Sequence, residues 1–203
     1  MNDRLNPVAL LRAMFTNKVT AWALCAVLVG LPVISGSACL HAEPAEEYAL
    51  KAAFVLNFAK FTQWPAEAFS DAADRLDLCV VGDPLMRKVF KEIDGQKVDK
   101  RFMRVIFVEG TGELPGCALL FVGRTTDRDT LLKLIAAVAG KPVLTIGETD
   151  DFARIGGVMN FIVNDGKLHF EVNPETARQQ KLTQSSRLLK LATIVTGRNP
   201  EDR

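Results

Sequence analysis

The chain has 203 residues, an apolar share of 48% and a formal net charge of +1 at neutral pH. This length suits one domain of ordinary size. The near-neutral charge excludes the basic field that favours nucleic acid as a partner. Since no internal repeat and no low-complexity linker interrupts the sequence, we expect a single folded domain.

The first 42 residues have the layout of a secretory signal peptide. Three basic residues, Arg4, Arg12 and Lys18, precede an uncharged apolar stretch over residues 19–34, and small or helix-breaking residues follow. The apolar stretch is shorter than the roughly 20 residues of a membrane-spanning helix, and an uncleaved N-terminal anchor is the alternative. We therefore expect export to the periplasm, removal of residues 1–42, and no membrane span in the processed chain.

Two cleavage points fit this segment. Cleavage after Ala42 puts a large residue, Leu40, where a small one is preferred, whereas cleavage after Ala38 fits the small-residue rule and makes Cys39 the first residue. A lipoprotein anchored through Cys39 is the lesser alternative, because Gly36 stands where such signals usually carry Leu. Cleavage at the later point changes the formal net charge from +1 to −1, which gives no case for anionic partners.

The four cysteines separate at the cleavage region. Cys25 lies in the apolar segment and Cys39 beside the cleavage point, which leaves Cys79 and Cys117 as an even pair in an exported chain. An oxidising compartment makes a disulfide the expected state, and this bridge would stabilise the fold by about 3–4 kcal/mol. The alternatives are two buried free thiols or a redox-reactive pair, although the pair lacks the close spacing that lowers a thiol pKa.

Residues 48–64 predict one long helix with a broad apolar face. Apolar side chains recur there at three- and four-residue steps, and such a face suits the central packing element of a small domain. Lys51 is one of the few polar residues that interrupt the pattern. Pro65 lacks an amide hydrogen and restricts Trp64, so the helix should end just before it. The apolar residues are Tyr48, Ala52, Phe54, Val55, Phe58, Ala59 and Phe61.

Strands and helices alternate along the rest of the chain. The Asn164-Asp165-Gly166 turn predicts a hairpin, in which alternation directs Phe161 and Val163 to the core. This order favours an α/β domain over residues 43–197 with a mostly parallel central sheet, an antiparallel edge hairpin and helices on both faces; residues 198–203 should fray. The expected strands are 76–82, 101–108, 117–123, 142–147, 158–163 and 168–172, and the expected helices are 84–92, 127–139, a short one from 149 to 156, one from 173, and a last one carrying Leu188 to Val195.

No pattern for catalysis, a metal or a cofactor occurs in the sequence. His169 is the only histidine beyond the expected signal peptide, so a histidine-rich metal site is excluded. The nucleophile-elbow, dinucleotide and phosphate-loop motifs are also missing. We therefore predict a protein that is not an enzyme and uses no cofactor. Two other classes stay open, a periplasmic small-molecule-binding protein that feeds a sensor and a secreted enzyme with an unfamiliar site, since fold does not fix function.

The outer face of the hairpin is a candidate partner-binding surface. Alternation places Asn160 and Ile162 on one strand, and His169 and Glu171 on the other, away from the core. This mixture of polar and apolar side chains is typical of a contact surface; an ordinary solvated sheet face is the alternative. Arg187 is a weaker candidate, because the serines before it are first of all a helix cap.

Several segments resemble the YfiR-like family of periplasmic regulators. The resemblance covers nearly the whole chain after the signal peptide, in order and at compatible spacing. It implies a regulator without catalysis, because the family's named member represses a membrane-bound diguanylate cyclase by binding its periplasmic sensory domain, which lowers cyclic-di-GMP. The similar segments are 51–65, 78–83, 116–123, 142–147, Gly156-Gly157 with Asn160-Phe161, 168–173 and 185–189.

The same resemblance bears on the disulfide and on the partner. The named family member has two disulfides; Cys79 and Cys117 match one, and the other has no counterpart in this chain. The expected partner is the periplasmic domain of a membrane-bound sensor, with a diguanylate cyclase first and a sensor kinase as the alternative. A homodimer is compatible with the sequence.

Overall fold

The computed structural model describes residues 44–69, 74–112 and 114–197. The predicted signal peptide, Cys25, Cys39 and the predicted frayed tail lie outside these residues. Among the described residues, no helix is both long and apolar enough to cross a bilayer.

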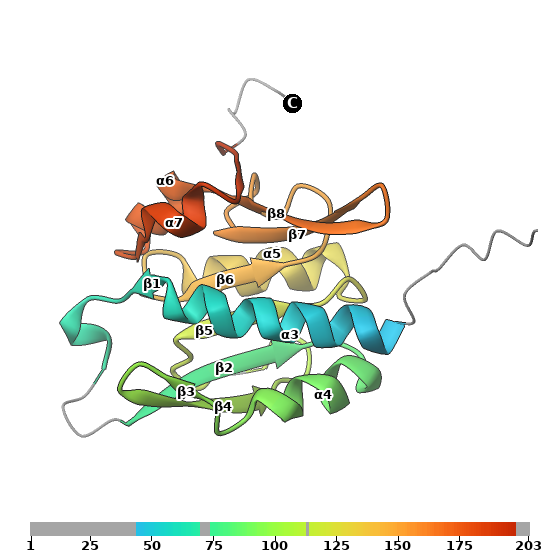
Figure 1. Cartoon of the computed structure of the whole chain (residues 1–203), viewed down its shortest axis with the longest axis horizontal. Coiled ribbons are helices and arrows are strands. Elements are labelled where there is room, and N and C mark those ends of the chain that lie inside the picture. The colour runs from blue at the N-terminus through green and yellow to red at the C-terminus, as the bar shows by residue number, and fades with distance from the viewer. Residues whose placement is uncertain (1–43, 70–73, 113, 198–203) are drawn as a thin grey trace, which may run out of the picture. The chain divides into compact units, whose positions relative to one another are not determined.

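An eight-stranded sheet lies at the centre of the domain, in the order β10-β8-β7-β6-β5-β2-β4-β3 (Figure 1). Neighbouring strands from β4 to β7 are parallel, and so is the β10–β8 pair; the β3–β4 and β7–β8 pairs are antiparallel. The predicted α/β class with a mostly parallel sheet is therefore confirmed. The strands are β2 (Arg75–Val81), β3 (Lys97–Val98), β4 (Arg101–Phe107), β5 (Leu119–Val122), β6 (Leu144–Gly147), β7 (Met159–Asn164), β8 (Lys167–Val172) and β10 (Thr193–Ile194).

Helices cover both faces of this sheet. In Figure 1, α3 (Pro44–Lys60) and α4 (Pro84–Phe90) lie in front of it and α5 (Arg128–Val138) lies behind. Alternate residues of β2 show the two layers: Leu78 and Val80 pack in the cluster that contains the α3 residues, whereas Cys79 and Val81 pack in the cluster that contains the α5 residues. Two short helices, α6 (Pro174–Gln179) and α7 (Ser186–Leu189), follow the hairpin.

Side-chain caps form at the starts of two of the expected helices. Asp83 accepts a hydrogen bond from the Met86 N–H at 2.9 Å before α4. Asn173 accepts one from the Thr176 N–H at 3.1 Å before α6. In both cases proline occupies the first helical position, where its missing amide hydrogen costs no hydrogen bond.

The first helix ends earlier than predicted. It stops at Lys60 because the chain then enters a two-residue strand, β1 (Thr62–Gln63), which pairs antiparallel with β9 (Thr183–Gln184). The Phe61 carbonyl also accepts the Ser185 N–H at 2.9 Å. The backbone after Lys60 is thus used for pairing with a distant segment, well before Pro65 could end the helix.

The edge of the sheet differs from the prediction. The predicted last helix is wrong beyond Leu189, because β10 leaves the helical path and pairs with Glu171 and Val172 of β8. The β7–β8 hairpin is therefore next to the edge strand and is not itself the edge. Leu191 and Ile194, expected on a buried helix face, are exposed.

The predicted helix over residues 149–156 is also wrong, and this segment consists of turns. Its Phe152 is fully buried, and its ring occupies the space beside Gly147 and Gly157. A Cβ atom added at Gly147 would lie 2.3 Å from this ring, and one added at Gly157 would lie 2.2 Å from it. The two glycines let the phenyl ring pack closely against the backbone, in the cluster that contains the α5 residues.

Candidate functional site

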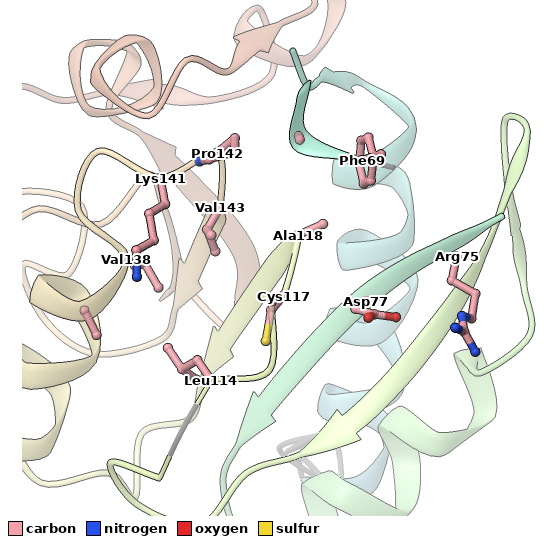
Figure 2. A pocket seen from close by; sticks show the side chains of 13 residues that line it. Phe69, Arg75, Asp77, Leu114, Cys117, Ala118, Val138, Lys141, Pro142 and Val143 are labelled. Carbon is pink, nitrogen blue, oxygen red and sulfur yellow. The ribbon is translucent and has the colours of Figure 1, made fainter. Parts of the chain in front are cut away.

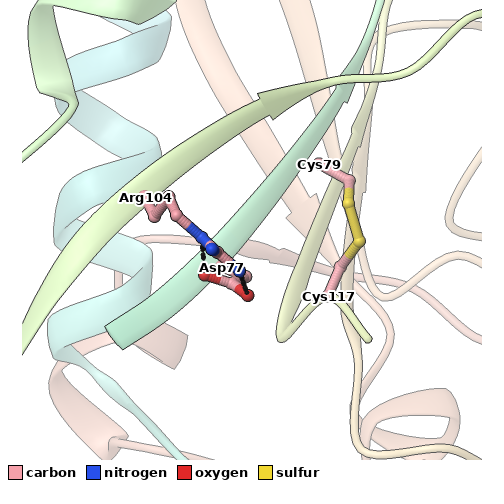
Figure 3. Close-up of a disulfide and its surroundings, with 4 residues drawn as sticks. All are labelled: Asp77, Cys79, Arg104 and Cys117. Atoms are coloured by element: carbon pink, nitrogen blue, oxygen red, sulfur yellow. Dashed lines mark hydrogen bonds and ion pairs between the residues drawn. A yellow bond between two sulfur atoms is a disulfide. The ribbon is translucent and has the colours of Figure 1, made fainter. Parts of the chain in front are cut away.

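Cys79 and Cys117, 38 positions apart in sequence, form the predicted disulfide (Figure 3). The bridge joins β2 to the segment just before β5 on the α5 side of the sheet. Beside it, Arg104 of β4 donates two hydrogen bonds to the Asp77 carboxylate of β2, one of them at 2.7 Å from its Nε. Neighbouring parallel strands are therefore tied both covalently and by a charged pair.

An ion cluster with a buried Lys51–Glu148 pair lies at the carboxyl ends of β5 and β6. Lys51 on α3 pairs with Glu47 one turn earlier and with Glu148 directly after β6. Arg124, directly after β5, pairs with both carboxylates, and its backbone N–H donates to Glu148 at 2.8 Å. The side chains of Lys51 and Glu148 are each 1% exposed. Two cations and two anions thus neutralise each other within the fold.

The environment holds these groups in their charged forms. Burial alone would raise the pKa of Glu47, but the bonds and charges of Lys51 and Arg124 lower it overall. Burial alone would lower the pKa of Arg124, but Glu148 and Glu47 raise it overall. The opposite charges therefore outweigh the cost of burial in both groups.

Tyr48 and Asp83 form a second polar contact at the same edge of the sheet. The Tyr48 hydroxyl donates to Asp83 Oδ2 at 2.9 Å. Burial and this hydrogen bond raise the pKa of Tyr48 well above its usual value. Burial works to raise the pKa of Asp83, but hydrogen bonds from the Met86 N–H and the Tyr48 hydroxyl lower it overall.

These contacts occupy the place where open α/β sheets usually bind ligands. In the order β4-β2-β5-β6-β7, the chain adds β4 on one side of β2 and then β5, β6 and β7 on the other side, so the topological switch point lies between β2 and β5. Ligands commonly bind outside the carboxyl ends of the strands at such a point. Here Met86 packs against the ends of both strands. A Cβ atom added at Gly82 would lie 2.2 Å from the Met86 sulfur, and one added at Gly123 would lie 2.4 Å from the Met86 methyl carbon. Met86 thus occupies part of this position, and a hollow of about 210 Å³ remains beside Gly82, lined also by Thr125 and Thr130.

A hollow of about 500 Å³ opens beside the ion cluster. Its walls combine the charged side chains of the cluster with Asp150 and with the end of β7. Among the predicted contact residues, Ile162 lines this hollow. The residues are Lys51, Arg124, Glu148, Asp150, Phe161, Ile162, Val163 and Asn164.

Four of the predicted contact residues do share one face of the hairpin. Ile162 lies opposite His169, and Asn160 lies opposite Glu171. His169 is exposed and Ile162 is half-buried. The expectation that Asn160 points to solvent is wrong: it is 1% exposed, and its amide donates to Glu171 at 3.2 Å.

The turns at 149–157 cover this end of the face. The Arg154 guanidinium lies 3.9 Å from the Glu171 carboxylate. The Asn173 amide donates to the Ala153 carbonyl at 2.8 Å. Alternation along a strand shows which face a residue is on, but not whether another segment covers that face. The prediction that Asn160 is exposed is wrong for this reason.

Arg187 lies apart from the other candidates. It is exposed on α7, but its neighbour Leu188 packs in the cluster on the α3 side, whereas His169 faces the opposite side of the sheet. Val163, predicted to face the core, is 58% exposed near the end of β7. We use the name hairpin surface for four accessible residues near the turn end of the hairpin: Ile162, Asn164 and His169 on one of its faces, and Val163 on the other.

A second hollow, of about 410 Å³, lies at the opposite, amino-terminal edge of the sheet (Figure 2). Figure 2 shows Lys141 and Pro142 on one side of it and Phe69 on the other. Asp77 and Cys117 line it, but the former is paired with Arg104 and the latter is in the disulfide. In the described part of the chain, no group of three or more His, Cys, Asp or Glu residues is placed to hold a metal ion.

The ion cluster was missed at the level of sequence, although one signal points to it. Lys51 lies on the apolar face of its helix, one residue from Ala52 and three from Tyr48. A lysine on a buried face needs a partner, and Glu47 is four residues away, at the spacing of a helical ion pair. The pairing with Glu148 depends on the sheet order, which the sequence pattern does not specify.

Comparison with known families gives one match over this domain. The family described as YfiR/HmsC-like matches residues 48–193. This range begins within α3 and ends in β10, so it includes the disulfide, the whole hairpin and all of the ion cluster except Glu47. No curated protein matches the chain.

Proposed function

The chain belongs to the YfiR/HmsC-like family, and from that premise we propose that it binds the external sensory domain of a membrane-bound diguanylate cyclase and holds it inactive, so that cyclic-di-GMP falls. At the level of the family, the function is regulation of cyclic-di-GMP signalling from the periplasm. The family match over residues 48–193 is the observation that carries the proposal.

The proposal includes the absence of catalysis by this chain. The family is a regulatory one. In its fold, Tyr48, Lys51 and Met86 occupy part of the strand ends at which an α/β enzyme would commonly hold its substrate. Regulation then depends on binding, and a binder shifts its partner's equilibrium only by its different affinities for the two states.

The hairpin surface is the proposed contact with the partner. Val163 places an exposed apolar side chain beside the charged rim formed by Arg124 and Asp150, and the exposed imidazole of His169 lies on the other face of the same hairpin end. An apolar centre with a polar rim is the usual composition of a protein contact. Glu171 is a poorer probe than these residues, because it already bonds to Asn160 and pairs with Arg154.

Binding of purified components tests this proposal. The periplasmic domains of the membrane-bound diguanylate cyclases of the same cell are purified one by one and titrated with the protein by biolayer interferometry. We expect one of them to bind, and we expect Val163→Glu and His169→Glu each to weaken binding by about tenfold or more. Leu132→Glu, which changes an exposed leucine on α5 in the same way, should bind like the wild type.

The experiment tests the partner class and the contact surface separately. If no cyclase domain binds, the proposed partner class is wrong. If a domain binds but Val163→Glu and Leu132→Glu bind equally well, the partner is right and the hairpin surface is wrong. Melting temperatures of all variants should match the wild type within about 2 °C, since these side chains are exposed.

A further inference from the structure

A third hollow, of about 350 Å³, lies against the C-terminal end of α3 and contains unpartnered polar atoms. Thr62 of β1 is 4% exposed, yet its hydroxyl has no hydrogen-bond partner among the described residues. Arg101, at the start of β4, has a buried Nε that also has none there. Both residues line the hollow. Buried polar atoms in native proteins are nearly always hydrogen-bonded, so two buried, unpartnered polar atoms on residues that line one hollow make it a candidate ligand site.

The charge of Arg101 is also unmatched. Its guanidinium stacks on the ring of Phe69, with Cζ 3.8 Å from the ring centroid. Within the described chain it forms no ion pair, whereas Arg104 on the same strand makes two hydrogen bonds to Asp77. A half-buried cation without an anion is unfavourable, and a guanidinium fork is shaped to hold a carboxylate with two parallel hydrogen bonds.

Aromatic rings form the apolar part of the hollow. The Trp64 indole N–H donates to the Ala118 carbonyl at 3.2 Å, which fixes the orientation of the ring. Phe69 lies 6.2 Å away, at an interplanar angle of 61°. Both rings line the hollow together with Pro65. They offer flat apolar surface within the same hollow as the Arg101 guanidinium.

We propose that this hollow binds a small organic monocarboxylate with a flat apolar body. The carboxylate accepts hydrogen bonds from Arg101 and from the Thr62 hydroxyl, and the body packs on Trp64 and Phe69. A doubly charged phosphate fits less well, because Asp99 also lines the hollow and repels it. This site is separate from the hairpin surface and does not depend on the proposed partner.

Trp64 provides a direct readout of binding. The chain has two tryptophans, Trp22 and Trp64, so Trp22→Phe leaves only the one that lines the hollow. We expect benzoate to change its fluorescence saturably, with a dissociation constant of about 1 mM or tighter. Benzamide, which has the same ring without the charge, should bind about tenfold more weakly, and inorganic phosphate should not compete. Equal binding of benzamide, competition by phosphate, or no response to benzoate would overturn the proposal.

Two substitutions test the residues themselves. Arg101→Gln should weaken benzoate binding by about tenfold or more, and Thr62→Val by about threefold to tenfold. Thr62→Val should not lower the melting temperature of the free protein, because it removes a buried hydroxyl without a partner. Arg75→Gln, an exposed arginine outside this hollow, serves as the matched control and should bind like the parent. Unchanged binding in Arg101→Gln would rule out the site as described.

Discussion

Lys51 and Glu148, 97 positions apart in sequence, form an ion pair between α3 and the end of β6, and each side chain is 1% exposed. A buried pair of this kind adds little stability compared with apolar residues of the same size. Loss of one partner is much more costly, because it leaves the other charge buried alone. The attachment of α3 to the sheet should therefore be sensitive to either residue.

Lys51→Met should lower the free energy of unfolding by about 3 kcal/mol, since Glu148 then keeps only Arg124 as a cationic partner. Urea unfolding followed by circular dichroism measures this change. Lys60→Met is the matched control, because Lys60 is an exposed lysine on the same helix and its loss should change stability by less than about 0.5 kcal/mol. Equal midpoints for the two variants would show that the Lys51 charge is not buried.

Stability should fall in acid as Glu47 and Asp83 are protonated. Their pKa values are lowered in the folded state, from ordinary values of 4.5 and 3.8. A group with a lowered folded pKa contributes stability above its unfolded pKa and loses it as the pH falls through the folded value. Urea midpoints should thus be level from pH 7 to pH 5 and decline below about pH 4.5. A Glu47→Gln variant should show a shallower decline, and an unchanged slope would contradict the assigned role of Glu47.

Tyr48 is the only tyrosine of the chain, so its ionisation can be followed directly by absorbance. Burial and the bond to Asp83 raise its pKa above the ordinary value of 10.0. We expect no phenolate signal in the folded protein at pH 10.5, and a sharp signal once alkali unfolds the chain. The stability that this shift provides is complete below pH 10 and is lost as the pH rises further. Titration of a folded protein near pH 10 would contradict the Tyr48–Asp83 contact.

The Cys79–Cys117 bridge should stabilise the fold mainly by lowering the conformational entropy of the unfolded chain. With a separation of 38 residues, replacing both cysteines by alanine should lower the free energy of unfolding by about 3–4 kcal/mol in the chain-entropy description. A protein expressed from residue 43 onward, without the predicted signal peptide, should also show no reactive thiol until it is unfolded and reduced. Two reactive thiols in the unreduced protein would show that the bridge does not form.

Much of the fold follows from local patterns. The apolar runs of β5 and β6 predict strands covered on both faces, and the Asp83-Pro84 and Asn173-Pro174 pairs predict helix starts. All of these features occur in the structure. The disulfide is the expected state from the number of cysteines and the predicted export.

Features that depend on distant pairing were not predictable. Strands of two residues, such as β1, β9 and β10, are too short to show a period. Their positions depend on the segments with which they pair. The burial of Asn160 depends in the same way on the turns around Phe152, and the partner of Lys51 depends on the order of the strands. In each case the deciding contact is remote in sequence.

The central claim is tested most directly by intracellular cyclic-di-GMP, measured by mass spectrometry in cells that lack the protein and in cells that express its variants from the same locus. The account predicts that deletion raises cyclic-di-GMP, that wild type and Leu132→Glu restore the lower level, and that Val163→Glu does not. A cyclic-di-GMP level that is the same with and without the protein would contradict it.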